Sequence, residues 1–146
     1  MPESDLDHFV QAQDQVIDQV HRELRAGRKQ SHWMWFVFPQ LVGLGRSSTA
    51  RYYAIASLDE ARTYLKHAVL GPRLIECTEL VNDITNRSVL EIFGTPDDLK
   101  FHSCMTLFAT AEPTAGAFQN ALAKYFGRAR DRLTVKLLGP APEIKQ

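Results

Sequence analysis

A run of six consecutive apolar residues, from Trp33 to Phe38, constrains the fold more than any other stretch of the chain. Both tryptophans of the protein lie in it. A helix or strand of this composition has no polar face to turn toward water. We therefore expect all its side chains, including Trp35, to be enclosed by the rest of the chain, and we interpret the remaining segments as the helices that enclose it.

The local conformation of this run is predicted to be a short helix with Ser31 as its N-cap. A strand is the alternative, because Trp, Phe and Val favour strands. The helix is preferred because no second segment has the alternating pattern of a strand partner. Pro39 disfavours helical geometry at Phe38 and ends the segment.

Helix-start residues and helical periodicity account for most of the remaining chain. The first helix is expected from a capping box at Ser4 and Asp7 to a glycine cap at Gly27. The later predicted starts are Ser47 or Ser48, Ser57 with Glu60 (ending near Gly71), Pro72, Thr95 with Pro96, Pro113 and Asp131. Near Ser88 the pattern is interrupted and predicts only one or two helical turns.

The helix after Thr95 is predicted to be central, because from Ser103 onward its only polar side chains are small hydroxyls. The fold class is therefore all-α: a single-domain orthogonal bundle of six to eight short helices around a buried central helix. We expect this domain to cover residues 1–139. The sequence Gly139-Pro140-Ala141-Pro142 predicts a flexible C-terminal tail over 140–146.

Charge and composition limit the partners of the protein. The 146 residues include 17 basic and 17 acidic side chains, so no global field attracts nucleic acid or an anionic membrane. Because the N-terminus is acidic and leads into an amphipathic pattern, we expect no signal peptide and a cytoplasmic location. In that compartment Cys77 and Cys104 are expected to be reduced thiols, with a disulfide as the alternative.

Metal and cofactor motifs are absent from the sequence. The five histidines show no HxxxH or HExxH spacing, the cysteines form no CxxC, and no nucleophile elbow is present. We expect no metal and no cofactor. The oligomeric state is left open.

A glycine-containing loop, Gly43 to Ser48, has the features of an anion site. Glycines allow backbone amides to converge, a helix start supplies partial positive charge, and Arg46 adds a bidentate donor beside Ser47. The alternative is a structural loop in which the glycines permit the turn and a serine caps the helix. The spacing is neither that of a P-loop nor that of a dinucleotide fingerprint.

Further polar candidates flank this loop and the apolar run. Lys29 and His32 precede the aromatic residues, and polar groups beside an apolar wall are typical of a small-ligand pocket. The alternatives are a core histidine at position 32 and aromatic residues that serve packing. Arg73 and Lys100 could close the site from elsewhere in the chain, or could simply be solvated surface residues.

The resulting candidate site consists of Lys29, His32, Arg46, Ser47, Arg73 and Lys100. Two functions remain open: binding of a small anionic, phosphate- or nucleotide-like metabolite, with or without catalysis, and a non-catalytic interaction domain in which the distinctive residues serve packing. A deep pocket lined by these residues would favour the first function.

The string from Lys29 to Gln40, followed by Gly43-Leu44-Gly45 and Ser47, resembles the signature of the bacterial family catalogued as domain of unknown function 1810. Later segments also match, and they are Leu70-Gly71-Pro72-Arg73-Leu74, Ile92-Phe93-Gly94 and Met105-Thr106-Leu107-Phe108. The resemblance covers nearly the whole chain. It implies a helical bundle with one helix surrounded by five others, and it implies no particular activity.

Overall fold

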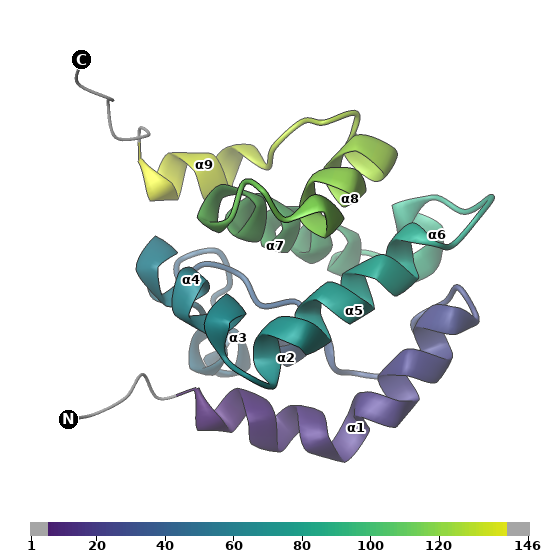
Figure 1. Ribbon diagram of the computed structural model, residues 1–146, viewed down its shortest axis with the longest axis horizontal. Coiled ribbons are helices and arrows are strands. Elements are labelled where there is room, and N and C mark those ends of the chain that lie inside the picture. The colour runs from purple at the N-terminus through teal and green to yellow at the C-terminus, as the bar shows by residue number, and fades with distance from the viewer. Residues whose placement is uncertain (1–5, 140–146) are drawn as a thin grey trace.

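The computed structural model describes residues 6–139, which form one bundle of nine α-helices (Figure 1). The helices are α1 (Asp7–Arg25), α2 (Met34–Val37), α3 (Ser48–Tyr52), α4 (Leu58–Lys66), α5 (Leu70–Asn82), α6 (Val89–Phe93), α7 (Asp97–Ala111), α8 (Gly116–Phe126) and α9 (Arg132–Leu138). Within that range the only β pairing is an isolated bridge between Leu41 and Ile55. The all-α, single-domain prediction is confirmed.

The number of helices is one above the predicted six to eight. Three of the nine, α2, α3 and α6, have only four or five residues each. Such short elements form because tertiary contacts fix them rather than because of helix propensity, so a sequence pattern separates them poorly. No helix in residues 6–139 is long and apolar enough to cross a membrane.

Helix α7 is the centre of the bundle, as predicted. It packs against α4, α6, α8 and α9, and it lies in the middle of the molecule in Figure 1. Every side chain from Ser103 to Ala109 is buried. Because two full turns are buried on all sides, α7 can only fold with its neighbours in place.

Several predicted caps are confirmed. Ser47, Ser57 and Asp131 each accept a hydrogen bond from the backbone amide three residues later, at the starts of α3, α4 and α9. At α6, which was expected as one or two helical turns, Ser88 and Glu91 form a complete capping box.

Other predicted starts and stops are wrong. Thr95 does not cap α7: Pro96 occupies the N-cap position, with no side-chain cap. Ser31 does not cap α2, which is preceded by Trp33. The proposed capping box at Ser4 lies outside the described residues, as does the predicted tail over 140–146.

Gly71 does not end α4, contrary to expectation. Helix α4 ends at Lys66, and Gly71 lies in the first turn of α5. A Cβ at this position would lie 2.0 Å from the carbonyl oxygen of Leu65, so only glycine lets the two helices meet this closely. The imidazole Nδ1 of His67 caps the turn by accepting hydrogen bonds from the amides of Val69 and Leu70.

The apolar run is only partly enclosed. Trp33, Met34, Val37 and Phe38 are buried, but Trp35 and Phe36 are half-buried, contrary to prediction. Because α2 is a single turn, its side chains diverge, and the indole of Trp35 reaches the edge of the bundle. There the ammonium of Lys100 lies 4.8 Å from the ring centroid of Trp35, which is a cation–π contact.

The two tryptophans should therefore differ in their contribution to stability. Trp33, 1% exposed, should lose about 3–5 kcal/mol of unfolding free energy when replaced by alanine, the range for truncating a fully buried large aromatic. Trp35→Ala should lose about 1–2 kcal/mol, because part of its ring stays in water. Urea denaturation of both variants tests this, and equal losses would contradict the difference in burial.

Cys77 and Cys104 are unpaired thiols on different helices, as predicted. Burial raises the pKa of Cys77 to about 12, and it also raises the pKa of Cys104. A thiol-specific reagent should accordingly react with neither cysteine in the native protein at pH 8, because the thiolate is the reactive form. Denaturation without reductant should release two reactive groups; a single fast-reacting thiol before denaturation would contradict this burial.

Candidate functional site

The six predicted site residues do not converge on one pocket. Arg73, on α5, forms an ion pair with Asp14 of α1 at 2.9 Å, so it stabilises the contact between those helices. His32 is exposed in the loop before α2, which contradicts the alternative of a core histidine. Lys29 and Lys100 meet at one carboxylate, that of Asp97. Arg46 and Ser47 lie in the exposed loop before α3.

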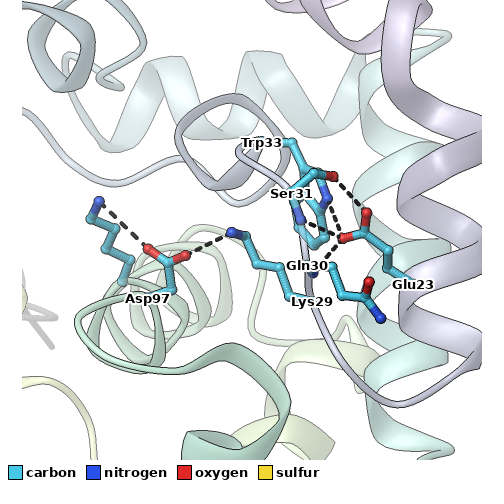
Figure 2. A network of polar contacts seen from close by, with 7 residues as sticks. Glu23, Lys29, Gln30, Ser31, Trp33 and Asp97 are labelled. Atoms are coloured by element: carbon cyan, nitrogen blue, oxygen red, sulfur yellow. Dashed lines mark hydrogen bonds and ion pairs between the residues drawn. The ribbon is translucent and has the colours of Figure 1, made fainter.

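The residues after Lys29 are held by a buried acid on α1, Glu23, which is 4% exposed. Its carboxylate accepts hydrogen bonds from the amides of Gln30 (2.7 Å) and Ser31 (3.0 Å), from the Ser31 hydroxyl, and from the indole N–H of Trp33 at 2.9 Å (Figure 2). Gln19 adds a fifth bond from its side-chain amide, at 2.7 Å. We call these five residues the Glu23 network.

The Glu23 network explains the polar half of the signature string. Burial alone would raise the pKa of Glu23, but the Ser31 hydroxyl, the Gln30 amide, the Gln19 side chain and the Ser31 amide outweigh burial and lower this pKa to about 2. With both oxygens occupied by donors, the carboxylate has a structural role: it fixes the loop before α2 to α1.

Asp97, in the first turn of α7, is shared by two lysines. The Nζ atom of Lys29 lies 2.8 Å from one carboxylate oxygen, and the Nζ atom of Lys100 lies 3.6 Å from the other. Figure 2 shows Lys29 reaching across from the Glu23 side toward Asp97. One negative charge thus faces two positive charges, and the closer lysine, Lys29, is the better neutralised.

The glycine loop owes its composition to its own geometry. Gly43 has a φ of +100°, a conformation that favours glycine. At Gly45 a Cβ would lie 2.4 Å from the Cβ of Ala50, so a side chain would separate the loop from α3. Ser47 caps α3. Because α3 has only five residues, its dipole gives little support to an anion site.

A hollow of about 270 Å³ lies where this loop meets α7 and the start of α9. Its lining residues, which define what we call the Lys100 hollow, are Gln40, Leu44, Gly45, Pro96, Leu99, Lys100, Ser103, Asp131 and Leu133. The side-chain amide of Gln40 donates to the Ser103 hydroxyl at 2.7 Å, and that hydroxyl donates to the carbonyl of Lys100. Of the predicted site residues, Lys100 lines this hollow.

Two larger hollows, of about 540 and 500 Å³, lie on another part of the surface, along α5 and the start of α8. Neither is lined by a predicted site residue, although their walls do carry polar side chains, which are Arg62, Lys66 and Glu112 in the first and Glu79, Asn82, Asp83 and Asn120 in the second. Among residues 6–139 no group of three or more His, Cys, Asp or Glu could hold a metal ion. We take the Lys100 hollow as the candidate functional site because a predicted site residue, Lys100, lines it, whereas none lines the two larger hollows.

Sequence reasoning missed the two acids that organise this region. Glu23 lies on the buried side of α1, where it interrupts an apolar face. A charged residue at such a position could have been recognised in the sequence as a buried acid. Asp97 was assigned no role in the site. Asp131 was identified as a helix start, and nothing in the sequence brought it near Lys100.

The fold and the hollow together define a class: an all-α bundle around one buried helix, with a small polar hollow at its edge. The family described as "Protein of unknown function (DUF1810)" matches residues 3–138, and the chain belongs to that family. This confirms the resemblance noted in the sequence. No curated protein matched the chain.

A solved structure supports the same fold. The chain is similar to the crystal structure of the conserved hypothetical protein Rv1873 from Mycobacterium tuberculosis, with 58% sequence identity and a TM-score of 0.92. The match covers 94% of this chain and 98% of the other.

The Glu23 network should make stability depend on pH. The pKa of Glu23 is about 2 in the folded protein and 4.5 in the reference state, so its contribution is complete above pH 4.5 and is lost as the pH falls toward 2. At pH 7, Glu23→Gln should lower the free energy of unfolding by about 3 kcal/mol, and the deficit should shrink in acid. Urea titrations from pH 7 to 2.5 measure it.

Glu79→Gln, at an exposed position on α5, is the matched control and should follow the wild type at every pH. A deficit for Glu23→Gln that stays constant from pH 7 to 2.5 would mean that the lost charge is not responsible.

Proposed function

We propose that this domain binds a small ligand with an anionic phosphate or carboxylate group in the Lys100 hollow. The observation that carries this proposal is that Lys100 lines a hollow while its ammonium has a single, long ion pair, at 3.6 Å, with a carboxylate that is already paired with Lys29. Asp97 is the only carboxylate within ion-pair distance of Lys100 in residues 6–139, and Asp97 is already closer to Lys29. A ligand anion would supply the missing charge.

Hydrogen-bond donors beside Lys100 support the same proposal. The amide of Gly45 donates to no hydrogen bond among the described residues. Gln40 uses its amide group to reach Ser103, and an amide nitrogen carries two hydrogens, so a second donor remains. Two neutral donors and one ammonium match an anionic group that accepts several hydrogen bonds.

The proposed site is smaller than the one expected from the sequence. Lys29 is left out because it is paired with Asp97, and Arg73 because it is paired with Asp14. His32 is left out because it is not among the lining residues. Arg46 and Ser47 border the site next to Gly45, where the exposed guanidinium of Arg46 can approach a ligand from the rim.

A second candidate, a non-catalytic interaction domain, is supported by the apolar surface next to the hollow. Leu133 and Leu137, one turn apart on α9, are exposed, as is Val42, which lines a neighbouring hollow together with Leu137. Exposed apolar side chains that lie together are typical of contact surfaces. This alternative gives no role to the charge of Lys100, which separates the two functions experimentally.

Replacement of Lys100 should weaken anion binding. A lost charge-assisted hydrogen bond costs about 1.5–3 kcal/mol, so Lys100→Gln should reduce affinity about ten- to a hundredfold. Calorimetry with inorganic phosphate, acetate and 4-methylpentanoate at constant ionic strength measures the affinity. Lys66→Gln, which removes an exposed lysine at the end of α4, is the matched control and should leave affinity unchanged.

Equal affinity in wild type and Lys100→Gln would contradict the proposal, as would the absence of binding by all three anions to the wild type. The interaction-domain alternative would then be preferred, and Leu133→Ser with Leu137→Ser would test it by the loss of a partner or of self-association.

A further inference from the structure

We infer that the ligand of the Lys100 hollow is a zwitterion of amino-acid size, with a carboxylate that binds Lys100 and an ammonium that binds Asp131. This inference rests on the proposed function, because it uses the same hollow and the same lysine. It adds a second charged recognition element, of opposite sign, in the wall of the hollow.

Asp131 has one carboxylate oxygen committed to the fold and one available. Its Oδ2 atom accepts hydrogen bonds from the amide (3.0 Å) and the hydroxyl (2.6 Å) of Thr134, and through these bonds Asp131 caps α9. Among residues 6–139, no hydrogen bond reaches Oδ1, and no Lys, Arg or His lies within ion-pair distance of the carboxylate. The neighbouring Arg130 donates instead to Thr110.

The hollow therefore has one positive and one negative side chain, Lys100 and Asp131, and neither is fully neutralised by a charge of opposite sign. Among residues 6–139, Lys100 shares its only acid with another lysine, and Asp131 has no cation within ion-pair distance. A simple anion would be attracted by Lys100 and repelled by Asp131. A simple cation would be attracted by Asp131 and repelled by Lys100. A ligand with both charges gains from both groups and leaves neither without a partner.

The rest of the lining indicates a small ligand with an apolar body. Leu99 and Leu133 are 60% and 62% exposed, and both line the hollow together with Leu44. Covering these side chains would remove apolar surface from water. The volume of about 270 Å³ is just below the range of about 300–1,000 Å³ typical of pockets for drug-sized ligands. Such a volume suits an amino acid better than a nucleotide.

The test uses probes that differ only in their charged groups. Leucine carries both charges, 4-methylpentanoate lacks the ammonium, and 3-methylbutylamine lacks the carboxylate, on nearly the same carbon skeleton. A second set, 6-aminohexanoate with hexanoate, covers a wider separation of the charges. We expect at least one zwitterion to bind the wild-type protein tenfold or more tightly than its matched carboxylate, measured by calorimetry at constant ionic strength.

Asp131→Asn is the informative variant, because an asparagine side-chain oxygen can still accept both hydrogen bonds from Thr134 and so preserve the cap of α9. It should bind the preferred zwitterion tenfold or more weakly than the wild type and should bind the matched carboxylate more tightly, since the repulsion is gone. Loss of folding alone would weaken both. Lys100→Gln should weaken every carboxylate-bearing probe.

The outcomes distinguish the two proposals. Equal wild-type affinities for zwitterion and matched carboxylate, with both weakened by Lys100→Gln, would overturn the zwitterion and leave the anion site standing. Affinities that do not respond to Lys100→Gln, or no binding by any probe, would overturn both. A zwitterion preference that persists in Asp131→Asn would overturn the assignment of Asp131 as the ammonium partner.

Discussion

The buried carboxylate of Glu23 is the interaction on which the arrangement of the N-terminal third depends. A charge this far from water is tolerated only when its oxygens are fully hydrogen-bonded, and five bonds from Gln19, Gln30, Ser31 and Trp33 achieve this. Since four of these five bonds come from the loop before α2, satisfying the charge also positions that loop. The apolar run is thereby directed into the bundle, where Trp33 and Phe38 are buried.

The same loop connects the core to the candidate site through Asp97. Lys29 follows Arg28 and precedes the Glu23 donors, so its position is set by the Glu23 network, and its ammonium occupies one side of the Asp97 carboxylate. Lys100, one turn beyond Asp97 on α7, has the longer contact with this carboxylate, at 3.6 Å, besides its cation–π contact with Trp35. A structural ion pair thus determines how much positive charge remains at the hollow. Lys29, a residue of the signature string, therefore influences the charge of Lys100 although Lys29 does not line the hollow.

The all-α class, the central position of α7 and most helix starts followed from the sequence, because helical periodicity, capping side chains and an all-round apolar segment are local properties. The candidate site was only partly predictable. Gly45 of the glycine loop and Lys100 both line the hollow. Arg73 instead pairs with Asp14 across α1 and α5, and His32 is exposed before α2 and is not among the residues that line the Lys100 hollow.

By itself, the sequence determined which segments are helical and which one must be buried, since those outcomes depend on residues within a few positions of one another. Only the tertiary structure decided the partners of the charges. Gly71 is typical of a helix end, yet it lies within α5. A glycine is needed there because the end of α4 approaches its backbone closely. Asp131 reads as a cap and is one, but its proximity to Lys100 arises from the packing of α9 on α7, between residues 31 positions apart. Such contacts depend on how whole helices pack, which no local pattern encodes.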